Sequence, residues 1–263
     1  MISDHFPNVR GLIIDMDGVL WHDLNPIGDL PALFNAMRDQ GYQFIMATNN
    51  ATRTVAEYHQ ILNDFGVFLE SWQIINAAQA TASFLLEKYP NGCRVYVVGQ
   101  PSLKDTLREH GHTVVDETAN DVQVVVGSLD YDLTYHKIKH ASLLIQNGCE
   151  FYGTNPDVTL PTPEGLIPGG GTVIGAIELA SMHKAVMIGK PEPLLYQMAL
   201  KRLALSPEET LGIGDRLETD IAGAQAAGIH SALVLSGASS LGQARQFNPP
   251  PEIITANLME LIF

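Results

Sequence analysis

Gly11-Leu-Ile-Ile-Asp15-Met-Asp17-Gly18-Val-Leu20 is an apolar run that ends in two carboxylates, two positions apart. A short apolar run bounded by polar residues is typical of a buried strand, and open α/β sheets bind ligands at the carboxyl ends of such strands. A carboxylate at that edge can act as a nucleophile, and a second one two residues later can donate and accept protons. Gly18 supplies the backbone freedom that the turn needs. By itself, the same pattern also fits an ordinary Asp–Gly turn after a strand.

The rest of the chain repeats this alternation of short apolar runs and helical patterns, which is typical of a parallel sheet covered by helices on both faces. Further buried strands of the main sheet are expected at Tyr42–Thr48, Ala185–Gly189, Thr210–Gly214 and Ser231–Leu235. Helices are expected over Asp29–Gln40, Thr54–Phe65, Leu194–Leu203 and Thr219–Ala227. The sequence therefore predicts an α/β fold whose core is a doubly wound, Rossmann-like parallel sheet.

A second alternating series interrupts the first. Strands are expected at Arg94–Val98, Thr113–Val115, Val122–Gly127 and Glu150–Gly153, with helices near Ser102–His110 and Thr134–Gln146. Asn76–Tyr89 is expected to be the outgoing helix, and the Pro- and Gly-rich segment Pro161–Gly171 the return passage. We therefore expect a core formed by residues 1–77 and 182–263, and an inserted, smaller α/β cap domain formed by residues 78–181.

Composition excludes several classes of function. The 263 residues carry 15 basic and 29 acidic side chains, a formal net charge of −14. Because such a field repels phosphate backbones and anionic lipids, we expect neither nucleic acid nor a membrane surface as a partner. The two cysteines have no metal-type spacing, and no apolar run reaches the ~18 residues that span a membrane. The N-terminus also lacks the pattern of a signal peptide, so a cytoplasmic location is expected.

Three other predicted strands also end in residues suited to phosphate chemistry. Thr48-Asn49-Asn50 follows one of them, and its hydroxyl and amide groups can hold phosphoryl oxygens. Lys190 follows the second strand, and Asp215 follows the third. Carboxylates of Asp15, Asp17 and Asp215 gathered at one edge would repel one another unless a hard divalent cation lay among them. The pattern therefore predicts a magnesium site.

The ordered motifs together resemble the signature of the haloacid dehalogenase-like phosphohydrolases, namely Asp-x-Asp, then Thr or Ser, then Lys, then an acidic Gly-Asp motif. More narrowly, the chain looks like the NagD and p-nitrophenylphosphatase-type subfamily, which has an α/β cap. In the core, the matching segments are Asp15-Met-Asp17-Gly-Val-Leu20, Thr48-Asn-Asn50, Gly189-Lys-Pro191 and Gly214-Asp-Arg-Leu-x-Thr-Asp220. In the insert, they are Gly153-Thr-Asn-Pro-Asp157, Leu160–Gly165 and Pro168-Gly-Gly-Gly171. The resemblance spans most of the chain.

This resemblance implies a magnesium-dependent phosphomonoester hydrolase that acts on small phosphorylated metabolites through an aspartyl-phosphate. It makes Asp15 the nucleophile and Asp17 the group that protonates the leaving alcohol and then activates water. Thr48 and Asn49 would hold the phosphoryl group, while Lys190 would neutralise the charge of the nucleophile and the phosphate. In physical terms this is catalysis by positioning and charge neutralisation.

The resemblance also implies a set of metal ligands. Asp15 and Asp215 would bind magnesium through their carboxylates, and Asp17 through its backbone carbonyl. Asp220 lies five residues after Asp215, near the start of a predicted helix. It would orient water at the metal from outside the set of direct ligands.

The inserted domain lies between the Thr48 and Lys190 motifs, so we expect it to close over the phosphate pocket as a lid that selects the leaving group. The expected substrate-binding residues are Gly18 and Asn50 in the core, and Asp130, Tyr131, Asn155 and Asp157 in the insert. Phosphoglycolate, nucleoside monophosphates, pyridoxal phosphate and small sugar phosphates all stay open as substrates, and so does a homodimer formed through the cap.

Three other functions share parts of this pattern. A dehalogenase would need neither Asp17 nor a magnesium site, because halide leaves unprotonated. A phosphomutase would keep both aspartates of the first motif, but it needs a cap that lets a phosphorylated intermediate turn around. A non-catalytic phosphoacceptor or binding module would also carry an acidic pocket with Thr and Lys, but on a shorter chain without an insert. The phosphatase hypothesis accounts for more of the motifs than any of these.

Several weaker patterns favour structural roles. His136 and His140 are four positions apart on one predicted helix, but no glutamate lies between them, so we expect them on a solvated face. Gly169–Gly171 lacks the spacing of a dinucleotide loop, and we expect a flexible hinge there. The two cysteines are expected to pack as small apolar side chains. Tyr131 and Tyr135 fit either the core of the insert or an exposed functional loop.

Overall fold

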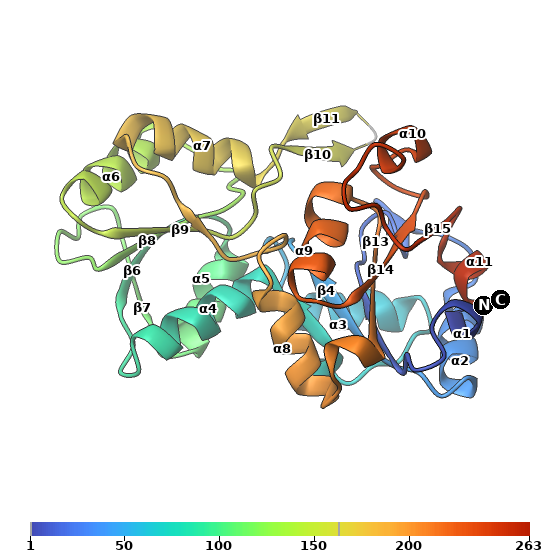
Figure 1. Ribbon diagram of the computed structural model, residues 1–263. Coiled ribbons are helices and arrows are strands. Elements are labelled where there is room, and N and C mark those ends of the chain that lie inside the picture. Colours follow the sequence, from blue (N-terminus) through green and yellow to red (C-terminus); the bar gives the residue numbers. More distant parts are fainter. Residues whose placement is uncertain (1, 163) are drawn as a thin grey trace. The chain divides into compact units, whose positions relative to one another are not determined.

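The computed structural model describes residues 2–162 and 164–263, and Met1 and Pro163 lie outside the described residues. The chain forms two compact units (Figure 1). Unit 1 comprises residues 1–48, 55–75 and 190–263, and unit 2 comprises residues 49–54 and 76–189. Over the two described ranges, no helix has both the length and the apolar character needed to cross a membrane.

Unit 1 is built on a six-stranded sheet in the order β15-β14-β13-β1-β4-β5. The strands are β1 (Gly11–Ile14), β4 (Gln43–Thr48), β5 (Ile74–Asn76), β13 (Thr210–Gly214), β14 (His230–Val234) and β15 (Ile253–Thr255). β1 pairs in parallel with β4 on one side and with β13 on the other. The chain therefore reverses its direction of winding at β1, and open α/β sheets form their ligand crevice at such a point.

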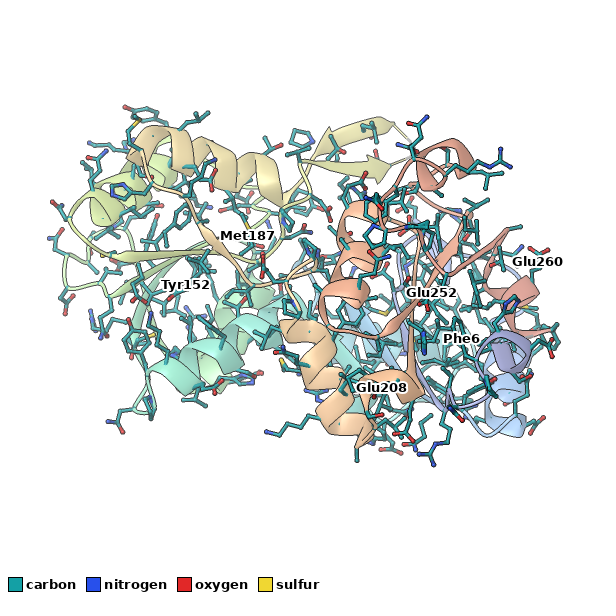
Figure 2. The ribbon with its side chains drawn as sticks, viewed as in Figure 1. Phe6, Tyr152, Met187, Glu208, Glu252 and Glu260 are labelled. Carbon is teal, nitrogen blue, oxygen red and sulfur yellow. The ribbon has the colours of Figure 1, made fainter. Side chains whose placement is uncertain are left out.

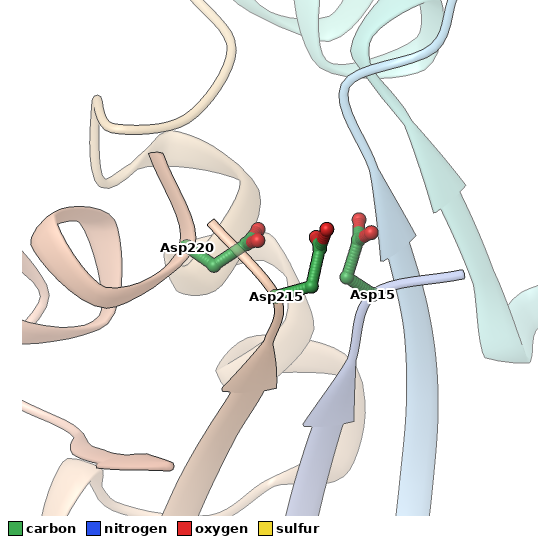
Figure 3. A group of neighbouring side chains, drawn as sticks. All are labelled: Asp15, Asp215 and Asp220. Atoms are coloured by element: carbon green, nitrogen blue, oxygen red, sulfur yellow. The ribbon is translucent and has the colours of Figure 1, made fainter. Parts of the chain in front are cut away.

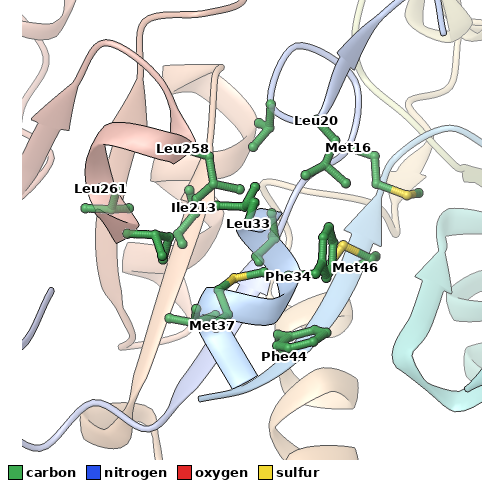
Figure 4. Packing of buried hydrophobic residues seen from close by; sticks show 14 of the residues in the cluster. Met16, Leu20, Leu33, Phe34, Met37, Phe44, Met46, Ile213, Leu258 and Leu261 are labelled. Carbon is green, nitrogen blue, oxygen red and sulfur yellow. The ribbon is translucent and has the colours of Figure 1, made fainter. Parts of the chain in front are cut away.

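The helices of unit 1 bury apolar residues, which in the longer α2 (Leu30–Asp39) are spaced three and four apart. These helices are α1 (Ile2–His5), α2 (Leu30–Asp39), α3 (Val55–Asp64), α8 (Leu194–Leu203), α9 (Ala222–Ala226), α10 (Leu241–Ala244) and α11 (Leu258–Ile262). α2 begins after Asp29, whose side chain accepts a hydrogen bond from the N–H of Ala32 at 3.0 Å, and this caps the helix. Its buried Phe34 packs edge-to-face against Phe44 of β4 at a ring separation of 5.3 Å (Figure 4).

Short elements of unit 1 lie before and after the strands of its sheet. A hairpin of two-residue strands, β2 (Trp21–His22) and β3 (Asn25–Pro26), follows the β1 loop. A single π-helical turn, η3 (Leu217–Ile221), joins β13 to α9, and 3₁₀ turns precede β5 (η1, Ser71–Gln73) and β13 (η2, Pro207–Glu209). Neither the hairpin nor the π turn is expected from the sequence, and π turns are frequent at functional sites.

Unit 2 is built on a five-stranded parallel sheet in the order β12-β9-β8-β6-β7. The strands are β6 (Arg94–Val98), β7 (Thr113–Val115), β8 (Val124–Gly127), β9 (Glu150–Gly153) and β12 (Val186–Met187). Its helices are α4 (Ala77–Lys88), α5 (Pro101–Glu109), α6 (Tyr135–Gln146) and α7 (Gly170–Ser181). A separate antiparallel hairpin consists of β10 (Thr159–Thr162) and β11 (Gly165–Pro168).

One predicted strand belongs to the other sheet. Ala185–Gly189 is expected to be a core strand, but β12 pairs with β9 in unit 2, with Val186 opposite Tyr152 and Met187 opposite Gly153 (Figure 2). β12 has only two residues and Val186 is 57% exposed, as is typical of an edge strand. A run of apolar residues in the sequence does not distinguish an edge strand from a buried one. The chain re-enters unit 1 at Lys190.

The expected hinge at Gly169–Gly171 is also wrong. Gly169 is the N-cap residue of α7, a helix that the sequence analysis does not anticipate, and Gly170 and Gly171 form its first turn. A Cβ atom on Gly171 would lie 2.2 Å from the carbonyl oxygen of Pro156, and one on Gly169 would lie 2.4 Å from that of Asp157. The glycines therefore allow the backbone of the preceding loop to lie directly against the helix.

The weaker patterns have mixed outcomes. Tyr131 and Tyr135 are 61% and 75% exposed, so they do not form the core of unit 2. His136 is exposed as expected, but His140 is half-buried and its ring packs edge-to-face on Tyr96 at 4.7 Å. Both cysteines are free thiols: Cys93 is buried, and Cys149 is half-buried and packs against the apolar core of unit 2, as expected.

Candidate active site

Three neighbouring strands of unit 1 place polar side chains at one edge of the sheet. β13, β1 and β4 lie side by side, and their ends carry Asp215, Asp15 and Thr48. The N–H of Asp15 still donates to the carbonyl of Ile213 at 2.9 Å, so Asp15 continues the ladder between β1 and β13. This bond fixes the backbone from which the carboxylate of Asp15 projects.

A group of three carboxylates lies at this edge. Oxygen atoms of Asp15, Asp215 and Asp220 all lie within 4.8 Å of one another (Figure 3). From the sequence, Asp17 is expected in this cluster, and Asp220 is expected outside the direct metal ligands. The π turn explains the difference, because it brings Asp220 back toward the end of β13, from which it is only six residues removed.

Lys190 lies among these carboxylates and is almost fully buried, with 2% of its side chain exposed. Its Nζ donates to Oδ1 of Asp15 at 2.7 Å, to Oδ1 of Asp220 at 2.6 Å and to the carbonyl oxygen of Ala47 at 2.9 Å. All three ammonium protons are therefore used, and the charge of Lys190 is held in one place.

The group contains three carboxylates and one ammonium, so the carboxylates repel one another when they are ionised. Burial raises the pKa of Asp15 well above its ordinary value, since the attraction of Lys190 is opposed by repulsion from Asp220 and Asp215. Burial and repulsion from Asp220 also raise the pKa of Asp215 to about 7, although the N–H of Ala238 acts in the opposite direction. Burial disfavours the charged form of Lys190, but Asp15 and Asp220 attract it strongly enough to raise its pKa. A further cation would relieve the repulsion among the carboxylates.

Asp17 lies outside the carboxylate group because the β2–β3 hairpin holds it. The indole Nε1 of the fully buried Trp21 donates to Oδ1 of Asp17 at 2.9 Å. The N–H of Gly18 donates to the carbonyl of Trp21 at 2.8 Å, which closes the loop. Sequence reasoning missed Trp21, whose only signal is its position just after the Asp-x-Asp motif.

The remaining predicted residues lie in unit 2. Asn49 and Asn50 directly follow Thr48 along the chain, and Oδ1 of Asn50 accepts hydrogen bonds from the N–H and hydroxyl of Thr52 at 2.9 and 2.6 Å. Oδ1 of Asn155 accepts from the N–H of Asp157 at 2.7 Å. These bonds order two loops of unit 2.

Asp130 and Tyr131 are adjacent in sequence but differ in surroundings. The side chain of Asp130 is 1% exposed, and its carboxylate binds Nζ of Lys137 at 2.8 Å and the N–H of Asp132 at 3.0 Å. Both of its oxygens are therefore engaged in ordering the loop. Tyr131 projects into solvent and keeps its ring available for a ligand.

Two family models match the chain. The model described as haloacid dehalogenase-like hydrolase matches residues 12–113, and a second one, described as HAD-hydrolase-like, matches residues 187–261. The chain is also 31% identical to the acid sugar phosphatase of Staphylococcus saprophyticus over 255 residues, which is 97% of each chain. The chain belongs to the haloacid dehalogenase-like hydrolases.

Solved structures of this family resemble the chain over almost its whole length. The glycerol phosphate phosphatase of Mycobacterium tuberculosis, in complex with magnesium, has a TM-score of 0.90 and 31% identity, covering 97% of this chain and 76% of its own. NagD from Escherichia coli K-12 has a TM-score of 0.87 and 29% identity, and the match covers 96% of this chain and 98% of the NagD chain. The chain is a phosphatase of the NagD type within the haloacid dehalogenase-like hydrolases, and its fold is the Rossmann-like α/β fold with a cap.

The carboxylate group has the donor chemistry for the divalent metal that phosphatases of this family use. Hard cations such as Mg²⁺ prefer carboxylate oxygens, and buried oxygens of three aspartates converge here. Both oxygens of Asp220 already accept hydrogen bonds, from Lys190 at 2.6 Å and from the N–H of Arg216 at 3.0 Å. Asp15 and Asp215 each keep one oxygen that receives no hydrogen bond within residues 2–162 and 164–263, so these two carboxylates are better able to hold a cation than that of Asp220.

Proposed function

We propose that this phosphatase is a Mg²⁺-dependent phosphomonoester hydrolase that works through a phosphoryl intermediate on Asp15. The observation that carries the proposal is the position of the Asp15 carboxylate, 2.7 Å from the ammonium of Lys190 and beside Asp215 at the end of β1. A carboxylate in that place can attack phosphorus while positive charge neutralises the phosphoryl oxygens. Bound Mg²⁺ would add positive charge at the same oxygens.

The proposed reaction has two displacements at phosphorus. In the first, a carboxylate oxygen of Asp15 forms a bond to phosphorus, the ester P–O bond breaks, and Asp17 gives its proton to the leaving alcohol. In the second, Asp17 takes a proton from water, the water oxygen bonds to phosphorus, and the bond to Asp15 breaks. The indole of Trp21 binds Oδ1 of Asp17 and leaves Oδ2 for the proton. Lys190 holds Asp15 in place through both steps.

The substitution Asp15→Asn tests the nucleophile. We expect it to abolish hydrolysis of p-nitrophenyl phosphate, because an amide cannot form the phosphoryl intermediate, and to leave the circular dichroism spectrum unchanged. Asp39→Asn is a matched control, since Asp39 is an exposed carboxylate at the end of α2. If Asp15→Asn kept about a tenth of the wild-type rate or more, with the contribution of contaminating phosphatase excluded, the assignment would be wrong.

The substitution Asp17→Asn should cause the phosphoryl intermediate to accumulate, so that it can be detected. The leaving group of p-nitrophenyl phosphate needs no proton, so this variant should still transfer the phosphoryl group to Asp15 but release it slowly. Rapid acid quenching followed by peptide mass spectrometry should then find one phosphoryl group on the peptide that contains Asp15. A phosphoryl group on any other residue would contradict the proposal.

We propose a small hydroxylated phosphate ester as the substrate, because the named relatives are an acid sugar phosphatase and a glycerol phosphate phosphatase. Unit 2 stays the proposed lid that selects the leaving group, with Tyr131 and Asp157 as the residues that contact it. Asp130 fits better as the residue that orders this loop. A panel of phosphate esters ranked by kcat/KM measures the preference, and a preference for aromatic phosphates over sugar and glycerol phosphates would contradict it.

A further inference from the structure

The loop that follows β14, Ser236–Ser239, lies against the carboxylate group of unit 1 and is absent from the family motifs discussed above. It contacts both of the loops that carry Asp15 and Asp215. The hydroxyl of Ser236 donates to the carbonyl of Gly18 at 2.7 Å. The N–H of Ala238 donates to Oδ2 of Asp215 at 2.6 Å. The loop therefore joins the end of β1 to the end of β13.

The carboxylate of Asp215 is enclosed by backbone on two sides. A Cβ atom on Gly237 would lie 1.9 Å from its Oδ2, and one on Gly18 would lie 2.5 Å from the same atom. No side chain fits at either position without moving Asp215. Because Oδ2 is covered by these glycines and bonded to Ala238, Oδ1 is the oxygen of Asp215 that is left to bind a cation.

Ser239 anchors the loop to the π turn that starts just after Asp215. Its hydroxyl accepts a hydrogen bond from the N–H of Leu217 at 3.0 Å, and its own N–H donates to the carbonyl of Asp215 at 3.0 Å. Ser239 is only 6% exposed, so water does not replace these bonds easily. The N–H of Leu217 belongs to the first residue of the π turn, where no partner within the turn exists. The hydroxyl of Ser239 supplies that partner.

We propose that the Ser236–Ser239 loop is a positioning element for the metal, and that Ser239 is its main anchor. The loop fixes the rotamer of Asp215 so that Oδ1 alone is presented to the cation, and it prevents the carboxylate from binding through both oxygens. This inference rests on the proposed function, in which Asp215 is a ligand of Mg²⁺. Ser239 is a positioning residue, since it acts through Asp215 and touches neither substrate nor metal.

Isothermal titration calorimetry of Mg²⁺ into the full chain, without substrate, tests the inference. We expect Ser239→Ala to weaken Mg²⁺ binding by about 10- to 100-fold, the usual effect of removing a group that orients a metal ligand. Ser239→Thr keeps the hydroxyl and should restore most of the affinity. Ser231→Ala is a matched control, because Ser231 is a buried serine of β14 whose hydroxyl has no hydrogen-bond partner among the described residues. It should bind Mg²⁺ like the wild type.

Kinetics give a second readout that a purely structural role would not move. Ser239→Ala should need about 10- to 100-fold more Mg²⁺ for half-maximal activity, while its kcat at saturating Mg²⁺ should stay close to that of the wild type. If Ser239→Ala does not fold, Ser236→Ala replaces it. Ser236→Ala removes only the bond to Gly18, and the same direction of change in Mg²⁺ affinity would support the proposal, while an unchanged affinity would overturn it.

The outcomes separate this inference from the function on which it rests. If the wild type binds Mg²⁺ and Ser239→Ala binds it equally well, the positioning role of the loop is wrong and the Mg²⁺-dependent mechanism stands. If the wild type itself binds no Mg²⁺, both are overturned. If Ser231→Ala weakens binding as much as Ser239→Ala does, the effect comes from general disturbance of β14, and the proposal is again wrong.

Discussion

Lys190 shows how one residue serves stability and chemistry together. It is buried between Asp15 and Asp220, and its three protons are all donated to oxygen atoms. Removing one member of a buried ion pair lowers the free energy of unfolding much more than removing an exposed pair does. The remaining charge is then buried with neither a partner nor solvent around it. The same fixed charge lies where a phosphoryl group would bind Asp15. The site is therefore organised before any substrate arrives.

Lys190→Met should lose activity and destabilise the chain by about 3 kcal/mol, since two buried carboxylates would then face each other without a counter-charge. Denaturant titration at neutral pH without metal measures the stability. Lys201→Met is the control, because Lys201 is an exposed lysine of α8 and its loss should change stability by less than about 0.5 kcal/mol. Equal stability of the two variants would contradict this explanation of Lys190.

The individual residues of the site could be predicted to different degrees. Asp15 and Asp215 follow strands that are neighbours in one parallel sheet, so their meeting at its edge follows from strand direction, whereas Lys190 follows β12 of the other sheet. Asp220 is expected near the metal but outside its direct ligands, and its contact with Lys190 could not be predicted because a π turn leaves no mark in a sequence. The contact of Trp21 with Asp17 is not predicted, because it depends on the β2–β3 hairpin. This hairpin turns through Asp23 and Leu24, both at positive φ, and so lacks the usual Asn-Gly or Gly-Gly sequence of a tight turn.

Among the elements, α7 depends on close backbone contact at its start. A Cβ atom on Gly171 would lie 2.2 Å from the carbonyl oxygen of Pro156, and backbone cannot move aside cheaply. Gly171→Ala should therefore destabilise the protein by about 1–3 kcal/mol. Gly175 lies in the same helix, and among the described residues no atom outside the helix backbone lies within 4 Å of a Cβ placed there. Gly175→Ala should therefore stabilise the protein by about 0.5–1 kcal/mol. Thermal unfolding of both variants measures this, and equal shifts in Tm would contradict the contact.

Glu150 connects β9 to α4, and its effect depends on pH. Nζ of Lys88 donates to Oε1 at 2.6 Å, and the hydroxyls of Tyr152 and Tyr89 donate to Oε2 at 2.8 and 2.9 Å. Burial raises the pKa of Glu150, but these hydrogen bonds outweigh it and lower the pKa below the ordinary 4.5. Because the folded-state pKa is the lower one, the contribution to stability is complete above pH 4.5 and is lost as the pH falls through the folded-state pKa.

Glu150→Gln should therefore lower the stability by about 0.5–1 kcal/mol at pH 7, a modest effect because the group is partly exposed. The difference from the wild type should shrink below pH 4.5, where the wild-type carboxylate takes up its proton. Melting curves at several pH values measure the difference. Asp121→Asn is the control, since Asp121 pairs with Arg94 at the surface and is 73% exposed. A loss in Glu150→Gln that does not depend on pH would show that packing, and not charge, is responsible.

The positions of the strands in the sequence are easier to predict than the pairing of each strand in a sheet. β7 and β9 lie where the alternation of apolar and polar residues places them. β12 was assigned to the wrong sheet, because its apolar letters match a core strand and only the pairing with β9 decides. α7 is not predicted because its first two residues are glycines of low helix propensity, and tertiary contact overrides that preference.

For the whole molecule, bound metal should couple activity to stability. A chelator should abolish hydrolysis and lower Tm, and Mg²⁺ should restore both, because a ligand that binds only the folded chain stabilises it by about 2.7 kcal/mol at 100 times its Kd. Ca²⁺ should restore activity poorly, since its larger and looser coordination allows a carboxylate to bind through both oxygens. Assays with each metal after exhaustive chelation measure the effect. Equal rates with Ca²⁺ and Mg²⁺ would show that the coordination geometry does not matter.

The order of strands in unit 1 has a consequence for biosynthesis. β1 and β13 are neighbours in the sheet, but roughly 200 residues separate them along the chain. A ribosome that adds about 5–20 residues per second therefore needs about 10–40 s between the two strands. The whole sheet of unit 2, which ends at Met187, emerges in that interval and can fold as a unit. Asp15 thus meets Asp215 only after about 200 further residues have been added to the chain.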